Sequence, residues 1–377
     1  MRIAFYAPLK PPDHAVPSGD RRMARLLIDA FECAGHEVEL ASRLRSWNGS
    51  PDPARQARLQ RVGGALAERL LRRYRARPAA ARPGAWLTYH LYYKAPDHIG
   101  PLVADALGIP YLVAEASVAD KRANGPWALG HEATIAALDQ AARVISLNPL
   151  DAKCLPHPER VRPIKPFLDP APFRAAAKRR AAARTEMAAA QGLDTAYPWL
   201  LAVAMMRPGD KLESYRLLAR TLEGLGDRDW QLLLVGDGPA RAEVEAAFAW
   251  AGTDRLRTYG VAEPDRLPGI YAACDLMVWP AVNEAYGMAI LEAQAAGLPV
   301  VAGYGEGLAA IVRDGETGLL TPPGDAVAFG AALRELLETP EKRRALGRAA
   351  ADKVAAEHTL EAAACRLDAI LAEVAAR

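Results

Sequence analysis

The sequence predicts an α/β protein with two doubly wound parallel sheets, one in each of two domains. The chain has 377 residues, 51% of them hydrophobic, and because a domain usually has about 100–200 residues, two domains are expected. Short apolar runs alternate with longer helical patterns, as in βαβ units. Between 166 and 196, prolines precede an Ala/Arg/Lys-rich segment, a change of composition typical of a connection. The predicted domains are 1–170 and 198–358, with a connecting helix at 171–197 and a last helix at 359–377.

The first domain is predicted to alternate strands with helices. Its strands are expected at Ile3–Ala7, Glu37–Ala41, Trp86–Tyr89, Tyr111–Ala114, Arg143–Leu147 and Val161–Ile164. A helical pattern at 21–34 follows the first strand and ends at Gly35, as a helix with a glycine cap does.

The second domain repeats this alternation. Its strands are expected at Trp199–Met205, Gln231–Val235, Leu256–Tyr259, Leu276–Trp279 and Val300–Ala302. After Thr359, an expected N-cap, the last helix carries an apolar face that we expect to pack back on the first domain. That face consists of Leu367, Ile370, Leu371 and Val374. In both sheets, ligands are expected at the carboxyl ends of the strands.

Composition excludes several classes of protein. The hydrophobic fraction argues against disorder, and the net charge of +2 argues against a nucleic-acid binder. The cysteines are Cys33, Cys154, Cys274 and Cys365, with no CxxC pair, which indicates a reduced, cytoplasmic compartment. No apolar run approaches the roughly 20 residues that span a bilayer, so an integral membrane protein is not expected.

The stretch from Trp279 to Val301 is the most informative motif. A buried strand ends at Pro280, a loop carries Glu284, and a helix is expected to begin near Tyr286 and to stop at Gly297. Backbone N–H groups around 287 and 288 would then face the ligand edge of the sheet. The helix dipole and these free donors together favour an anion such as a phosphate.

Glu292 is expected two turns into that helix. A carboxylate among apolar neighbours is costly unless it binds something, and a ribose diol is suitable because a carboxylate accepts two hydrogen bonds. By spacing alone, a solvated helix glutamate and a loop glutamate are an equal alternative. The strand, loop and helix context favours the nucleotide site.

The motif, taken with further segments, resembles the signature of family-4-type retaining glycosyltransferases of the GT-B fold (glycosyl transferases group 1). The further segments are Val235-Gly236-Asp237-Gly238-Pro239, 267–275 and 313–320. The resemblance covers nearly all of the second half and is weaker before residue 160. It implies two Rossmann-like domains that face each other across a cleft, with the acceptor on the first and the nucleotide sugar on the second.

The same resemblance implies a hexosyltransferase. The donor would be a UDP- or GDP-sugar, and the acceptor a glycan, a lipid-linked molecule or a small molecule, in cell-envelope, polysaccharide or glycoconjugate biosynthesis. Retention at the anomeric carbon, no metal and no cofactor beyond the donor substrate are implied. A sugar-nucleotide epimerase or hydrolase of the same fold, and a non-catalytic sugar-nucleotide-binding protein, remain alternatives.

Carried onto matching positions, the resemblance places Glu292 on the ribose and Glu284 near the donor sugar. Arg207 and Lys211 match a basic pair that neutralises the diphosphate, where fixed cations stabilise a leaving group that gains negative charge. Here only three residues separate the pair, which is tighter than usual. The alternative for Lys211 is an ordinary surface lysine at a helix start. The expected nucleotide contacts are Glu292, Gly287, Met288, Gly19 and Val261.

The first domain departs from the family pattern after its first strand. Relatives place two glycines there, whereas this chain has Ser18-Gly19-Asp20-Arg21. Gly19 can still supply a positive φ. Asp20 and Arg21 become candidate acceptor contacts, and the alternative is an ordinary turn with Asp20 as the helix N-cap.

Two residues at the ends of neighbouring strands are further candidates. His90 resembles a sugar-facing histidine of GT-B enzymes, although a lone histidine is equally often structural. Glu115 follows the next predicted strand, where relatives carry another polar residue, and we expect it to help select the acceptor.

No metal site is predicted. Asp227-Arg228-Asp229 imitates the metal-binding carboxylates of other glycosyltransferases, but it precedes a strand in a predicted surface turn. Arg241 occupies the third glycine position after Gly236 and Gly238, so the dinucleotide fingerprint fails as well.

The charge is distributed unevenly, because the segment between 55 and 82 is rich in arginine and Glu68 is its only acidic residue. The arginines are Arg55, Arg58, Arg61, Arg69, Arg72, Arg73, Arg75, Arg77 and Arg82. Leu59, Val62, Leu66 and Leu70 follow helical spacing, which predicts an amphipathic basic helix. Such a helix can rest on anionic lipid at the inner face of a membrane, or its apolar stripe can pack on the domain core.

Overall fold

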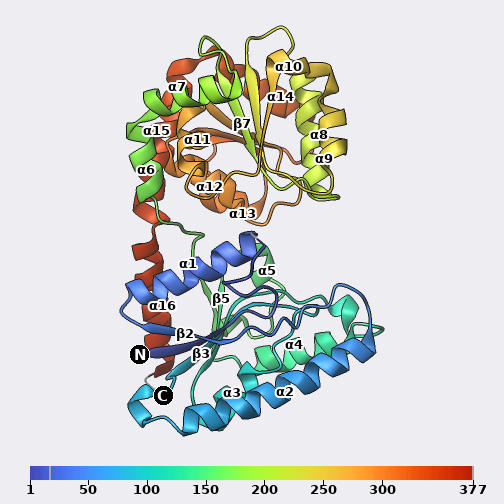
Figure 1. Ribbon diagram of the computed structural model, residues 1–377, viewed down its shortest axis with the longest axis vertical. Coiled ribbons are helices and arrows are strands. Elements are labelled where there is room, and N and C mark those ends of the chain that lie inside the picture. Colours follow the sequence, from blue (N-terminus) through green and yellow to red (C-terminus); the bar gives the residue numbers. More distant parts are fainter. Residues whose placement is uncertain (17, 376–377) are drawn as a thin grey trace. The chain divides into compact units, whose positions relative to one another are not determined.

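A computed structural model describes residues 1–16 and 18–375 (Figure 1). The chain divides into two compact units. Unit 1 comprises Met1–Lys165 together with the segment from Leu360 onward, and unit 2 comprises Pro166–Thr359. Each unit contains one six-stranded sheet in which all the strand pairs are parallel.

The sheet of unit 1 contains every strand predicted for the first half. Its strands are β1 (Arg2–Tyr6), β2 (Glu37–Ser42), β3 (Ala85–Leu91), β4 (Tyr111–Ala116), β5 (Arg143–Ser146) and β6 (Val161–Pro163), in the order β2-β1-β3-β4-β5-β6. The helices of this unit are α1 (Gly19–Cys33), α2 (Pro53–Arg75), α3 (Gly100–Leu107), α4 (Ala128–Gln140), α5 (Pro149–Ala152) and α16 (Leu360–Ala375). Buried side chains such as Phe5 and Trp86 fill the core.

The first and the last helix that the structure describes pack together in unit 1. Helix α1 begins after Ser18, whose Oγ accepts a hydrogen bond from the Arg21 N–H at 3.2 Å, and it ends before Gly35, which has a φ of 82°. Helix α16 packs against α1, and its residues Leu367 and Ile370 are fully buried. The prediction that the last helix returns to the first domain is therefore confirmed.

The apolar stripe predicted for the arginine-rich segment is partly wrong. The buried face of α2 includes Gly63, Ala67, Leu70 and Tyr74, whereas Val62 is 39% exposed. A Cβ at Gly63 would lie 2.4 Å from the Cβ of His98, which leaves no space for a side chain. Small residues therefore face the core where the chain approaches α2 closely, and this turns Val62 outward.

The sheet of unit 2 contains every strand predicted for the second half and one more. Its strands are β7 (Trp199–Val203), β8 (Gln231–Val235), β9 (Leu256–Gly260), β10 (Leu276–Trp279), β11 (Val300–Gly303) and β12 (Gly318–Thr321), in the order β12-β11-β10-β7-β8-β9. The unpredicted β12 is a sheet-edge strand in which Leu319 and Leu320 are only half-buried. Glycine at its start also weakens a strand pattern.

The helices of unit 2 surround this sheet. They are α6 (Ala171–Lys178), α7 (Arg180–Gln191), α8 (Asp210–Glu223), α9 (Arg241–Ala247), α10 (Gly252–Arg255), α11 (Leu267–Ala273), α12 (Met288–Ala295), α13 (Glu306–Ile311), α14 (Ala326–Glu338) and α15 (Pro340–Glu357). The segment 171–197, predicted to be a connecting helix, forms two helices, α6 and α7. Both of them pack on α11 (Figure 1). Phe173 and Leu193 enter the core of unit 2.

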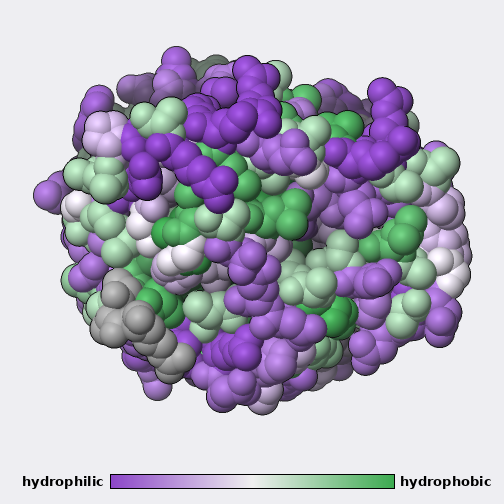
Figure 2. All heavy atoms as spheres, turned by 90° about the horizontal axis from the view of Figure 1, so that it is seen from below, coloured by the Kyte–Doolittle hydropathy of each residue, from purple (hydrophilic) through white to green (hydrophobic). Residues whose placement is uncertain are grey.

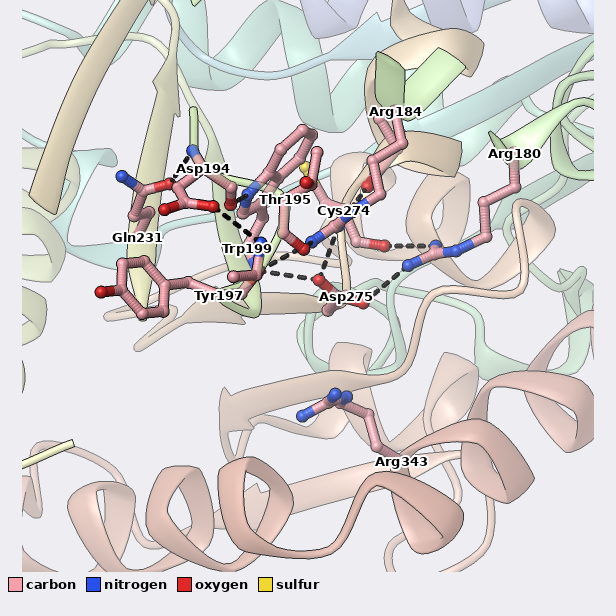
Figure 3. A network of polar contacts seen from close by, with 12 residues as sticks. Arg180, Arg184, Asp194, Thr195, Tyr197, Trp199, Gln231, Cys274, Asp275 and Arg343 are labelled. Atoms are coloured by element: carbon pink, nitrogen blue, oxygen red, sulfur yellow. Dashed lines mark hydrogen bonds and ion pairs between the residues drawn. The ribbon is translucent and has the colours of Figure 1, made fainter. Parts of the chain in front are cut away.

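A polar network attaches α7 to the sheet of unit 2 (Figure 3). Asp275, just before β10, accepts hydrogen bonds from Arg180 at 2.6 Å and from Arg184 at 2.8 Å. The same carboxylate accepts the Trp199 N–H at 2.8 Å. This network lies at the amino ends of β7 and β10, the edge of the sheet opposite to the one where ligands are expected.

The strand order reverses once in each sheet. The reversal lies between β1 and β3 in unit 1 and between β7 and β10 in unit 2. Loops leave neighbouring strands in opposite directions at such a switch point, and the space outside the carboxyl ends of these strands is where ligands bind in doubly wound sheets. The candidate residues therefore have to be examined at these two edges.

Candidate functional site

The loops that follow β7 and β10 bring two predicted site residues together at the switch point of unit 2. The ammonium group of Lys211, in the first turn of α8, forms an ion pair with the Glu284 carboxylate. Trp279, at the end of β10, donates its indole N–H to the same carboxylate oxygen at 3.2 Å. The Lys211 nitrogen also lies 5.4 Å from the centre of the Trp279 ring. The Lys211 ammonium and the Glu284 carboxylate therefore both contact the side chain of Trp279.

The loop that carries Glu284 has an unusual backbone. Ala281 has a φ of 57° and Asn283 a φ of 49°, in the left-handed region that residues other than glycine enter rarely. The first two turns of α8 hold this loop, because Asn283 Nδ2 donates to Asp210 Oδ1 at 3.0 Å and the Val282 N–H donates to Ser214 Oγ at 3.0 Å. Strained backbone of this kind clusters at binding sites.

Helix α12 presents its first turn after a glycine in the same conformation. Gly287 is the N-cap with a φ of 61°, and a Cβ there would lie 3.2 Å from Ile290 Cδ1. The helix begins at Met288, so the expected start near Tyr286 is two residues early. The first N–H groups of a helix have no partner within it, and this turn is suited to an anion.

Glu292 is buried in α12 with only 3% of its surface exposed. It is the fifth residue of the helix, so it lies about one turn in rather than the expected two. The Tyr271 hydroxyl, on α11, donates to its Oε2 at 2.9 Å. A buried carboxylate that already accepts a phenol hydrogen bond has the chemistry to accept hydroxyl groups of a ligand.

Two further residues of unit 2 proposed for the nucleotide side lie on exposed loops, whereas Gly19 is the first residue of α1 in unit 1. Arg207 is exposed in the loop between β7 and α8, and Val261, after β9, is 67% exposed. Gly236 and Gly238 let the neighbouring loops approach, since a Cβ on Gly238 would lie 2.3 Å from the Met206 carbonyl oxygen. These glycines therefore fix the course of the loop that carries Arg207.

The edge of unit 1 brings His90 and Asp20 together. His90 Nδ1 lies 3.0 Å from Asp20 Oδ1, and the side chains of both are about one third exposed. Burial opposes the ionisation of Asp20, but the hydrogen bond and the charge of His90 outweigh it and lower the pKa of the Asp20 carboxyl. His90 itself has a φ of 63°, and the Tyr92 ring centre lies 5.4 Å from its own.

At the start of α1, the alternative that Asp20 is the N-cap is wrong, and the positive φ that Gly19 could supply is not used. The N-cap is Ser18, so Asp20 is not the cap. Gly19 is the first residue of the helix and does not adopt a positive φ, because the turn before α1 is closed by the serine hydroxyl instead. The Arg21 guanidinium donates to the His14 carbonyl at 2.7 Å, which turns it toward the preceding loop.

Glu115 lies at the end of β4, next to His90 on β3, and it is buried with a φ of 58°. Its carboxylate accepts the Leu147 N–H after β5. Burial raises the pKa of this carboxyl from 4.5 to about 7. Burial also raises the pKa of Asp151 nearby, whose side chain accepts a hydrogen bond from Asn148 at 2.8 Å.

The sequence did not single out Trp279, Tyr271, Asp210 or Asn283. Trp279 and Tyr271 both lie within the quoted motifs, but the contact of Trp279 with Lys211 and that of Tyr271 with Glu292 join different elements of the fold. Among the residues that the structure describes, no three His, Cys, Asp or Glu side chains form a group that could hold a metal ion. Asp227, whose segment imitates the metal-binding carboxylates of other glycosyltransferases, forms ion pairs with Arg334 at 3.1 Å and with Arg228 at 3.0 Å.

Known proteins are similar in sequence to this chain over much of its length. A family model described as "Glycosyl transferases group 1" matches residues 197–339. A D-inositol 3-phosphate glycosyltransferase of Salinispora tropica is 31% identical over 300 residues, 72% of this chain and 61% of that protein. An alpha-D-kanosaminyltransferase of Streptomyces kanamyceticus is 32% identical over 194 residues, 51% of this chain and 50% of that protein. The matches thus span less than two thirds of these relatives.

Solved structures share the fold over the whole chain. Sucrose-phosphate synthase from Thermosynechococcus elongatus superposes with a TM-score of 0.74 at 22% identity, covering 100% of this chain and 99% of that chain. Anabaena Alr3699/HepE, solved in complex with UDP and glucose, gives a TM-score of 0.72 at 16% identity, covering 99% of this chain and 100% of that chain. The expected two-domain α/β architecture is confirmed.

Proposed function

We propose that this chain transfers a hexose from a nucleoside-diphosphate sugar to an acceptor, because a family model described as glycosyl transferases group 1 matches residues 197–339 in its second unit. The observation that carries this proposal is the Lys211–Glu284 pair, which sits beside the open first turn of α12 and near the buried Glu292 at one switch point. These groups match the parts of such a donor: a diphosphate, a sugar and a ribose.

In this proposal, each part of the donor has a protein group. Glu292, oriented by the Tyr271 hydroxyl, accepts hydrogen bonds from the ribose. Arg207, Lys211 and the N–H groups of Gly287 and Met288 stabilise the diphosphate. Gly19 and Val261 are the remaining proposed donor contacts. The cations matter most when the bond to the sugar breaks, because negative charge then grows on the departing phosphate.

We further propose retention of configuration without a metal ion. The bond between the anomeric carbon and the phosphate oxygen breaks, and the acceptor oxygen attacks from the face that the phosphate leaves. The departing phosphate takes the acceptor proton. Glu284 contacts the donor sugar, and the charge on the leaving group is met by Arg207 and Lys211. No cofactor other than the donor substrate takes part.

The acceptor is proposed to bind on unit 1, where Asp20, Arg21 and Glu115 are the candidate contacts and His90 is the candidate sugar-facing catalytic residue. The relatives include a D-inositol 3-phosphate glycosyltransferase and a 2-deoxystreptamine glucosyltransferase, so small polyols are the first acceptors to test. Glycans and lipid-linked acceptors, as in polysaccharide or envelope biosynthesis, are the other two classes. The UDP and UDP-glucose bound in solved HepE structures support a nucleotide-sugar donor.

The test is a screen of UDP-glucose, UDP-N-acetylglucosamine and GDP-mannose, each with and without inositol 3-phosphate or 2-deoxystreptamine, followed by NMR of the anomeric proton. A product with the donor's configuration supports the proposal. Isomerised or hydrolysed sugar from donor alone would favour the epimerase or hydrolase alternative. Donor binding without turnover under any of these conditions would favour a non-catalytic binding protein.

We also propose that the chain works in the cytoplasm, in peripheral contact with anionic lipid through α2. Arg73 and Arg77 bind Glu39, so they are not available to lipid. Arg58 and Arg61 remain exposed beside the exposed Val62. Figure 2, the view of Figure 1 from below, shows hydrophilic residues with several hydrophobic patches between them. Within the described residues, no helix combines the length and apolar character needed to cross a bilayer.

Vesicle flotation tests this contact. Each exposed arginine near an anionic surface contributes about 1 kcal/mol, so R58E/R61E should reduce flotation with phosphatidylglycerol vesicles. R344E/R348E changes the same charge on exposed residues of α15 and should leave flotation unchanged. Equal flotation of the wild type with neutral and anionic vesicles would contradict the lipid contact.

A further inference from the structure

Trp279 contacts two of the side chains proposed for the donor site, Lys211 and Glu284. It is 2% exposed at the end of β10, with its ring packed edge-on against Tyr215 at 5.0 Å between centres. Its indole N–H donates to Glu284 and its ring lies beneath the Lys211 ammonium. An aromatic ring attracts a cation over its face, and its N–H binds an anion in its plane.

The contact of Lys211 with Glu284 and the contact of Trp279 with Glu284 respond differently when a donor binds. If Lys211 turns to the diphosphate, its ion pair with Glu284 is lost. The Trp279 N–H to the same carboxylate oxygen remains, because it comes from a buried ring that the ligand does not displace. The loop around Glu284 is also held by Asn283 and Val282 through α8, but neither of these contacts reaches the carboxylate itself.

Resting on the proposed function, we propose that Trp279 is a positioning residue for the transfer step. It holds the Glu284 carboxylate toward the donor sugar once Lys211 has moved to the diphosphate, and it presents Lys211 before the donor arrives. Trp279 does not contact the reacting atoms, so its contribution should appear in the rate of transfer more than in nucleotide affinity.

The variant W279F keeps an aromatic ring and removes the N–H donor. A hydrogen bond to a charged group is worth enough that its loss should lower kcat about tenfold, while the calorimetric Kd for UDP, GDP or ADP changes less than about threefold. The matched control is W230F. Trp230 is equally buried in unit 2 and donates its N–H to the Leu225 carbonyl at 3.0 Å, so it reports the general cost of replacing a buried tryptophan.

A double-mutant cycle separates positioning from simple structural damage. If Trp279 acts through Glu284, W279F should lower kcat much less in an E284A background than in the wild type. Full additivity of W279F and E284A would overturn the proposal. An equal loss of kcat in W279F and W230F, in step with their melting temperatures, would also overturn it.

A fluorescence titration gives a readout that does not need turnover. Departure of the Lys211 cation from the Trp279 ring should change indole emission when UDP, GDP or ADP binds, and this change should be lost in W279F and kept in W230F. A change that persists in W279F would refute the role of Trp279 in presenting Lys211. Failure of all three nucleotides to bind the wild type would instead refute the proposed function.

Discussion

The two switch-point edges of this molecule are built on the same kind of sheet but differ in chemistry. The edge of unit 2 combines a lysine, two glutamates and the open first turn of α12. The edge of unit 1 combines a His90–Asp20 pair with a buried Glu115 whose carboxylate binds the chain's own backbone. The family model matches only within the second region.

This difference follows from what each edge is proposed to bind. A nucleoside-diphosphate donor always presents a diphosphate and a ribose, so a cation, a carboxylate and free N–H groups are residue types that suit it. The acceptor is a separate molecule whose chemistry the donor does not fix, so no residue type can be expected for it in advance. Unit 2 is therefore the part whose function can be inferred from residue types, whereas unit 1 needs its own measurements.

Removal of the Lys211 charge should have the largest effect. K211A leaves the leaving-group charge without this cation, and loss of such a donor lowers kcat about 10²- to 10³-fold. Steady-state kinetics with the best donor of the screen measures the loss. K178A, on exposed α6 of the same unit, is the control and should retain full activity. A K211A variant with the wild-type kcat would show that Lys211 does not stabilise the leaving group. It would therefore contradict the proposed difference in chemistry between the two edges.

Glu115 should make the stability of the chain depend on pH. Its pKa is raised from 4.5 to about 7 in the folded chain, so the folded state holds this proton more tightly than the unfolded state does. The contribution of Glu115 to stability is therefore most favourable below pH 4.5 and falls by about 3 kcal/mol as the pH rises toward 7. At higher pH the loss is complete.

The variant E115Q isolates this contribution, because glutamine keeps the shape and does not ionise. Urea unfolding at pH 5 and pH 8 should show the wild type losing stability relative to E115Q as the pH rises. A constant difference between the two proteins would show that Glu115 is not a buried, protonated carboxyl in the folded chain.

The His90–Asp20 pair should affect the acceptor side only. D20N removes the charge that orients His90, and kcat/KM for the acceptor should fall about tenfold, as expected for a lost hydrogen bond to a charged group. The Kd for the nucleoside diphosphate should not change. S18A removes the cap of α1 instead and costs about 1 kcal/mol of stability, with unchanged kinetics. A lower affinity of D20N for the nucleoside diphosphate would contradict the prediction that this pair acts only on the acceptor.

Asn283 should show the smallest effect. Its left-handed backbone is tolerated by glycine and disfavoured for alanine, so N283A should lower the free energy of unfolding by about 1 kcal/mol. N283G should cost less, although both variants lose the Asp210 contact. Chemical unfolding monitored by circular dichroism compares them, and equal losses in both variants would assign the stabilisation to the side chain rather than to the backbone.

Much of the fold was predictable because strand periodicity is a local property. The strands expected in both halves are present, and β12 was missed because it is half-buried at a sheet edge. The stripe on α2 was misplaced at Val62, since the need for a glycine opposite His98 depends on a tertiary contact. Gly19 was misjudged for a similar reason, because the Ser18 hydroxyl closes the turn.

The site was predictable only in part. Glu284, Glu292 and Lys211 stand in recognisable motifs, and the structure brings Glu284 and Lys211 together across 73 residues of sequence. Tyr271 and Trp279 lie in the same motifs, but their roles depend on which carboxylate each meets in the folded chain. The Asp20–His90 pair joins α1 to β3, and no spacing rule in the sequence indicates it.

The most direct test of donor binding at unit 2 is a calorimetric titration of the full chain with UDP, GDP and ADP, repeated with E292A. At least one of these diphosphates should bind the wild type, and E292A should weaken that binding at least about tenfold, because a ribose hydroxyl loses a charged acceptor. E115A is the control, a buried glutamate of unit 1 that should leave the affinity unchanged. Equal affinity of E292A and the wild type, or no binding of any of the three, would contradict a nucleotide site at Glu292.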